Sequence, residues 1–111
     1  MANKPGPKIE FLFWEDCPSH PKALELLQEV MAEVGVDSPI EKIEVLADED
    51  AARLAFPGSP TIRVDGVDID AEGAAQMGTA LTCRVYVLEN GRFSPLPSRE
   101  MLRRALVRGT E

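Results

Sequence analysis

The sequence predicts an α/β domain, because a strand, a long helix and a second strand follow one another in its first half. Residues 8–14 are apolar at both alternating sets of positions, which is typical of a strand that is covered on both faces of a sheet. Helical spacing begins at residue 18 or 19 and continues to Val34, and Gly35 ends the helix. Residues 40–46 form the second strand of a βαβ unit, which we expect to be parallel and right-handed.

The middle of the chain predicts a short helix and then a hairpin. The helix opens at the acidic residues 48–50, which suit the positive end of a helix dipole, and it runs to Phe56. The segment Pro57-Gly58-Ser59-Pro60 breaks it. Asp65-Gly66 supplies the positive φ angles of a tight turn between two short strands. These strands are residues 61–64 and 67–69.

The last third of the chain predicts a loop, a strand and a closing helix. Residues 71–82 are small and weakly patterned, so we expect a loop there. Residues 84–88 are a further strand candidate, turned by Asn90-Gly91. Ser98 caps a final helix that ends near Gly109.

Length and charge limit the organisation and the partners. The 111 residues suit one domain, which we place at residues 8–111 after a flexible tail at residues 1–7. The net charge of -7 argues against nucleic acid or an anionic membrane surface as a partner. Two charged clusters are predicted to be solvated faces rather than an anion site and a cation site. They are Arg99, Arg103, Arg104 and Arg108, and the acidic set Asp48, Glu49, Asp50, Asp65, Asp68, Asp70 and Glu72.

The chain start and the cysteine count predict a compartment. Residues 1–8 are polar and broken by proline and glycine, so they do not resemble a signal peptide, and no apolar run reaches the length of a membrane helix. We therefore expect a cytoplasmic protein, where thiols are kept reduced. Two cysteines in that setting indicate chemistry more than a structural disulfide.

Cys17 is the first candidate for that chemistry. It stands where the opening strand gives way to the long helix, and the partial positive charge at a helix start favours a thiolate. His20 follows within reach, where it could stabilise the thiolate, move a proton or bind a metal. The alternatives are a cysteine placed there by packing alone and an exposed histidine without a role.

Two segments resemble the thioredoxin-like superfamily, which includes thioredoxins and glutaredoxins. Phe13-Trp14-Glu15-Asp16-Cys17-Pro18-Ser19-His20 is similar to the active-site turn of that superfamily. Phe56-Pro57-Gly58-Ser59-Pro60-Thr61-Ile62 is similar to its cis-proline segment. The resemblance implies a thioredoxin-like fold, in which a βαβ unit and a cis-Pro β-hairpin unit form a mixed central sheet flanked by helices.

The resemblance also implies site residues. Cys17 and His20 would be catalytic, Pro60 would be cis beside Cys17, and the backbone of Ser59 would bond to an extended substrate. The full implied set of substrate-binding residues is Trp14, Pro18, Ser59, Pro60 and Thr61. The chain departs from the superfamily at two positions, because His20 stands in place of the second motif cysteine and Leu12 in place of a buried acid.

Cys83 decides between mechanisms. If the chain returns to the active-site end after the hairpin, Cys83 lies near Cys17; if residues 84–88 pair directly with the Pro60 strand, it lies at the far end. A buried, inert cysteine is the further alternative. Cys-Pro-x-His followed by Cys83-Arg84-Val85-Tyr86 is also similar to short chains named after alkylmercury lyases.

Three functions follow from these observations. In the first, Cys17 attacks a disulfide or another soft electrophile, His20 tunes it and Cys83 resolves the mixed disulfide, so that the partner is a protein disulfide or a small thiol such as glutathione. This function needs no cofactor. The second is binding of a soft metal or an organomercurial by Cys17, His20 and Cys83. The third is a non-catalytic module that docks a peptide at Pro60.

Overall fold

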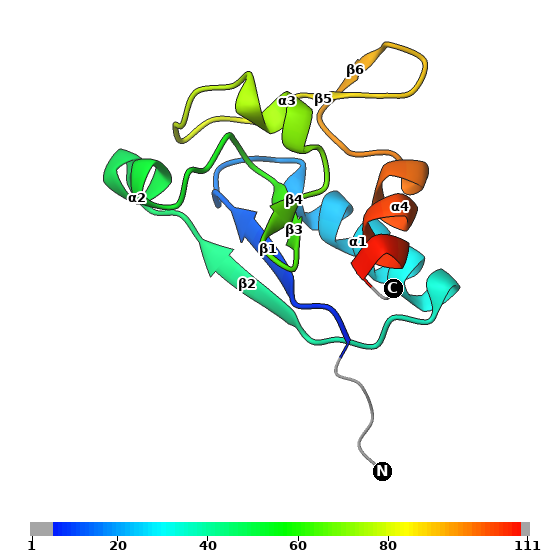
Figure 1. Ribbon diagram of the computed structural model, residues 1–111. Helices are drawn as coiled ribbons and strands as arrows, with labels where there is room; N and C mark the ends of the chain where they lie inside the picture. Colours follow the sequence, from blue (N-terminus) through cyan, green and yellow to red (C-terminus); the bar gives the residue numbers. More distant parts are fainter. Residues whose placement is uncertain (1–5, 110–111) are drawn as a thin grey trace.

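The computed structural model describes residues 6–109, which form an α/β structure around a mixed four-stranded sheet (Figure 1). Most of the predicted tail, residues 1–5, lies outside the described residues, as do residues 110–111. Of the remaining tail residues, Gly6 is exposed and Pro7 is buried. None of the helices within residues 6–109 has the length and apolar character that crossing a membrane requires.

The sheet has the order β2-β1-β3-β4. Its strands are β1 Ile9–Phe13, β2 Ile40–Glu44, β3 Thr61–Val64 and β4 Val67–Asp68. β1 and β2 are parallel, which confirms the predicted βαβ unit, whereas β3 runs antiparallel to both β1 and β4. The β3–β4 turn is also as predicted, because Asp65 and Gly66 have φ angles of 53° and 81°.

Helices cover the sheet on two faces, as the apolar pattern of β1 predicts. The helices are α1 His20–Val34, α2 Asp48–Arg53, α3 Ala71–Ala75 and α4 Arg99–Gly109. Ile9 and Phe11 of β1 pack in one core cluster with apolar residues of α1 and α4, which lie beside each other (Figure 1). Leu12 points the other way, into a second cluster with Val45 and residues of and after α2. Cys17 lies beyond the carboxyl end of β1 and before the start of α1.

The structure corrects two predictions in the last third of the chain. Residues 71–82 are not all loop, because α3 forms there, capped by the Asp70 side chain, which accepts a hydrogen bond from the N–H of Gly73. The strand predicted at residues 84–88 is reduced to β5 Tyr86–Val87, which pairs with β6 Phe93–Ser94 in a separate two-stranded sheet. A five-residue helix with no buried side chain has no apolar period that a sequence could reveal.

The closing helix and its basic face are close to the prediction. The Ser98 hydroxyl accepts a hydrogen bond from the N–H of Met101 at 3.0 Å and so caps α4. The arginines of α4 are exposed or half-buried, but they are not free of partners, because Arg99 and Arg103 form ion pairs with glutamates of α1. These pairs join the two helices on the outer surface.

Candidate active site: a pair of interacting thiols

Cys17 lies at the turn that joins β1 to α1. Its backbone N–H donates to the carbonyl oxygen of Trp14 at 3.0 Å, which closes the turn. The side chain is directed inward, and the residue is 1% exposed. Its Sγ lies 3.1 Å from the Ser19 hydroxyl oxygen and 3.3 Å from the Ser59 carbonyl oxygen, to which the thiol donates.

Cys83 reaches Cys17 through a parallel bridge to Ser59. The N–H of Ser59 donates to the carbonyl oxygen of Thr82, and the N–H of Arg84 donates to the carbonyl oxygen of Ser59, both at 2.8 Å. This pair of bonds places Cys83 alongside Ser59. The Cys17 Sγ also lies against the Ser59 carbonyl oxygen, so both cysteines flank the same residue, and each thiol affects the pKa of the other. Both thiols are free, but Cys17 is buried and Cys83 is exposed.

The surroundings move the two thiol pKa values in opposite directions. Burial acts to raise the pKa of Cys17, but hydrogen bonds from the hydroxyls of Ser19 and Ser59 outweigh it. The Ser19 backbone and Cys83 add further hydrogen bonds, so the pKa of Cys17 lies below its ordinary value. Desolvation and the interaction with the Cys17 thiolate raise the pKa of Cys83. Of the two sulfurs, Cys17 is therefore the one that loses its proton more readily.

The Ser59 hydroxyl makes hydrogen bonds both to the Cys17 sulfur and to the turn between β1 and α1. It accepts a hydrogen bond from the N–H of Trp14 at 2.9 Å, which leaves its own proton free to donate to the Cys17 sulfur. Ser59 is fully buried, so no water competes for that proton. The hydroxyl thereby fixes the turn and stabilises the thiolate at the same time.

The contacts of His20 are with Phe13 and Glu15, whereas the sequence led us to expect one with Cys17. Its ring stacks on Phe13 with 4.9 Å between ring centroids, and its Nε2 lies 3.7 Å from a carboxylate oxygen of Glu15. The hydrogen bonds that lower the pKa of Cys17 come instead from serines and from Cys83.

The predicted substrate-binding residues divide into buried and exposed groups. The Ser59–Pro60 peptide bond is cis. Ser59, Pro60 and Thr61 are buried. The backbone N–H and the carbonyl oxygen of Ser59 are both hydrogen-bonded to the segment Thr82–Arg84. Trp14 is half-buried and Pro18 is exposed. A substrate-binding role for these residues stays a prediction.

A buried ion pair anchors the Cys83 segment, and sequence reasoning missed it. The Arg84 guanidinium is fully buried and forms two parallel hydrogen bonds to the Asp68 carboxylate, at 2.8 and 2.9 Å. It also donates to the Thr61 hydroxyl and to the Asp70 carbonyl, and it stacks on the Tyr86 ring at 4.4 Å. Asp68 was predicted to be a solvated acid; it is instead the counter-ion of a buried arginine.

The one sequence feature that could have indicated this ion pair is the alternation of polar and apolar side chains along residues 84–87. Arg84 and Tyr86 point inward, while Val85 and Val87 are almost half exposed, which inverts the usual order of burial. The Tyr86 hydroxyl donates to the carbonyl oxygen of Pro60 at 2.6 Å. The segment is therefore fixed to the cis-proline loop at both of its inward side chains.

Gly58 allows the two segments to approach. Its φ angle is 134°, and an added Cβ would lie 2.8 Å from the Cα of Arg84. Only glycine combines that backbone conformation with that contact. The Thr61 hydroxyl donates to the Gly58 carbonyl oxygen at 2.6 Å, which holds the loop closed behind Cys17.

The arrangement gives no support to the alternative prediction of a metal site formed by Cys17, His20 and Cys83. Among residues 6–109, no group of three or more histidine, cysteine, aspartate or glutamate side chains is placed to hold a metal ion. The two sulfurs lie together, but His20 turns to Phe13 and Glu15.

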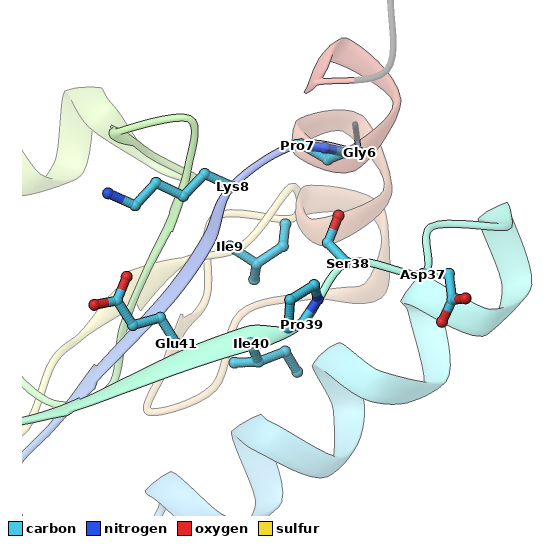
Figure 2. A pocket seen from close by; sticks show the side chains of 9 residues that line it. All are labelled: Gly6, Pro7, Lys8, Ile9, Asp37, Ser38, Pro39, Ile40 and Glu41. Atoms are coloured by element: carbon cyan, nitrogen blue, oxygen red, sulfur yellow. The ribbon is translucent and has the colours of Figure 1, made fainter. Parts of the chain in front are cut away.

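A pocket lies at the other end of the sheet. It has a volume of about 460 Å³ and is lined by residues 6–9 and 37–41, where β1 and β2 begin (Figure 2). Figure 2 shows the Lys8 and Glu41 side chains pointing to the same side of the two strands and the Ser38 hydroxyl directed toward the chain at Gly6. The pocket is lined by no cysteine or histidine, and the thiol pair lies beyond the opposite ends of the strands.

Comparisons with models of known protein families, with curated proteins and with solved structures find no match for this chain. The chemistry proposed below for the site is therefore based on its geometry alone.

Proposed function

We propose that this protein carries out thiol–disulfide exchange through a reversible Cys17–Cys83 disulfide. One observation carries the proposal: two free thiols flank Ser59, Cys17 through its sulfur and Cys83 through the backbone bridge, and the pKa of the first is lowered while that of the second is raised. A thiolate beside a protonated thiol is the arrangement from which a disulfide forms and to which it returns.

In this function Cys17 is the nucleophilic thiolate and Cys83 supplies the second sulfur. When the pair is oxidised, one S–S bond forms between them and two electrons pass to an external disulfide, which is cleaved to two thiols. The proton of Cys83 leaves with one of those thiols. His20 contributes through Phe13 and Glu15, by fixing the first turn of α1, rather than by a bond to the reacting sulfur.

The proposal includes a thioredoxin-like fold and a reducing compartment such as the cytoplasm. The fold is supported by the parallel βαβ unit, the antiparallel β3–β4 hairpin and a cis Ser59–Pro60 bond beside a cysteine that precedes α1. A reducing compartment would return the pair to the free thiols that start each cycle.

The test is oxidation of the wild-type chain with a small disulfide, followed by thiol counting and peptide mapping. We expect both thiols to disappear together and a Cys17–Cys83 cross-link to form within one molecule. The Cys17→Ser and Cys83→Ser variants serve as matched controls, because each keeps the shape of the side chain closely and removes one sulfur. Independent loss of the two thiols, with no internal cross-link, would refute the proposal.

A further inference from the structure

The Ser59 peptide next to Cys17 has no free hydrogen-bonding group. An extended polypeptide that binds as an added strand must bond to an exposed N–H and C=O of the receiving strand. Those groups of Ser59 are already used, since Thr82 accepts from one and Arg84 donates to the other at 2.8 Å. The chain's own segment Thr82–Arg84 thus lies where an extended substrate would have to pair.

This segment is held too firmly to be displaced by a passing peptide. Arg84 is fully buried in a two-bond ion pair with Asp68, whose side chain is 9% exposed. Moving Arg84 out would leave a charged carboxylate without its partner in a desolvated site, which is strongly unfavourable. The hydrogen bond from Tyr86 to the Pro60 carbonyl and the close contact at Gly58 add to this anchor.

The two sulfurs differ in access as well as in acidity. Cys17 is 1% exposed, because the Ser59 loop, Ser19 and Cys83 surround its sulfur. Cys83 lies on the outer side of the pair and is exposed. A sulfur atom from solvent must reach one of the two cysteine sulfurs before it can bond to it. Cys83 is the cysteine that solvent reaches, so the external sulfur meets Cys83 first.

We propose that the exchange partner is a small thiol or its disulfide and that it bonds to Cys83 rather than to Cys17. This inference rests on the proposed function and reverses the order expected from the sequence, in which Cys17 would take the external partner and Cys83 would resolve it.

The exchange has two steps. Cys83 gives up its proton and attacks a disulfide RSSR, so that a Cys83–SR bond forms, the S–S bond of RSSR breaks and one RSH leaves with that proton. The Cys17 thiolate then attacks the Cys83 sulfur, the internal disulfide forms and the second group leaves as RS⁻. Two electrons have passed from the cysteine pair to RSSR. In the reverse direction a small thiolate attacks Cys83, and Cys17 is the leaving group, a role that its lowered pKa favours.

The first experiment maps the mixed disulfide with hydroxyethyl disulfide as the probe. The Cys17→Ser variant should accumulate the adduct on Cys83. The Cys83→Ser variant, in which the segment still covers Cys17, should react at least about tenfold more slowly, because access limits exchange. Each rate is taken on the pH plateau where the thiol is ionised, so that the comparison is made per thiolate. A Cys83→Ser variant that reacts as fast as Cys17→Ser would overturn the inference.

Acid quenching of the wild-type reaction separates this inference from the proposed function. We expect a transient adduct on Cys83 followed by the internal disulfide. If the internal disulfide forms through an adduct on Cys17, this inference fails while the proposed function stands. If no internal disulfide forms at all, both fail.

The second experiment tests the size of the partner. The same hydroxyethyl disulfide is placed on the central cysteine of an extended peptide, and its rate is compared with that of the free probe. Equal or slower exchange supports a small partner. Exchange that is faster by about tenfold or more would show that a strand pairs beside the thiols and would overturn the inference.

Discussion

Replacing Asp68 with asparagine tests whether the buried ion pair holds the segment that covers Cys17. The substitution keeps the shape of the side chain but removes the charge that faces a fully buried guanidinium. Breaking a buried pair by removing one partner costs about 3–5 kcal/mol, and we expect about 3 kcal/mol because the amide oxygen keeps one hydrogen bond. The unfolding entropy of 111 residues is about 0.23 kcal/mol/K, so the melting temperature should fall by about 13 °C.

Two measurements test this prediction. Circular dichroism gives the unfolding midpoint, and alkylation with iodoacetamide in the Cys83→Ser background reports how often Cys17 becomes accessible. Both should change in Asp68→Asn, whereas Asp50→Asn, which removes a charge from the exposed pair with Arg53, should change neither. An unchanged midpoint would refute the stabilising role of the pair. A lowered midpoint with unchanged alkylation of Cys17 would refute the covering role of the segment.

Three further predictions concern the thiols and their loop, and a fourth concerns charge. Ser19→Ala should raise the pKa of Cys17 by about one unit, since a hydrogen bond to a charged group contributes about 1.5–3 kcal/mol, and the pH profile of alkylation measures the shift. His20→Ala should leave that profile where it is; a shift like that of Ser19→Ala would contradict the geometry. Gly58→Ala should destabilise the fold by about 1–3 kcal/mol from its positive φ alone, with an added contact to Arg84, and denaturant unfolding checks this. With a net charge of -7, the protein should exchange fastest with the dication cystamine and slowest with the dianion dithiodiglycolate, and added salt should reduce the difference.

The sequence was sufficient wherever local rules decide the structure. The two-sided apolar pattern of β1 predicts its two core contacts, and Asp65-Gly66 predicts the hairpin turn. The position of Cys17 before a helix also follows from the sequence. In each case the spacing of the apolar residues, or the residues of one turn type, is sufficient to select the backbone geometry.

The rest depends on contacts between segments that are distant in the chain. The path by which Cys83 returns to Ser59 is fixed by hydrogen bonds between backbones, which leave no residue pattern. The burial of Arg84 is set by its ion pair with Asp68, which lies 16 residues earlier in the chain. His20 was assigned to Cys17 from spacing along the helix, but the Phe13 ring offers a competing apolar contact in the other direction. Sequence spacing limits which residues can meet without deciding which do.

The hydrogen bonds around Cys17 also bear on the direction in which the proposed disulfide reacts. Ser19 and Ser59 stabilise the sulfur as an anion, and this stabilisation exists only in the reduced protein. When Cys17 forms the disulfide with Cys83, its sulfur is no longer charged. The buried hydroxyl of Ser59 and the half-buried hydroxyl of Ser19 then lose their anionic acceptor. Interactions that favour the reduced form make a disulfide easier to reduce. The same serines therefore favour return of the pair to free thiols, and the exposed Cys83 gives a small thiol the place to attack.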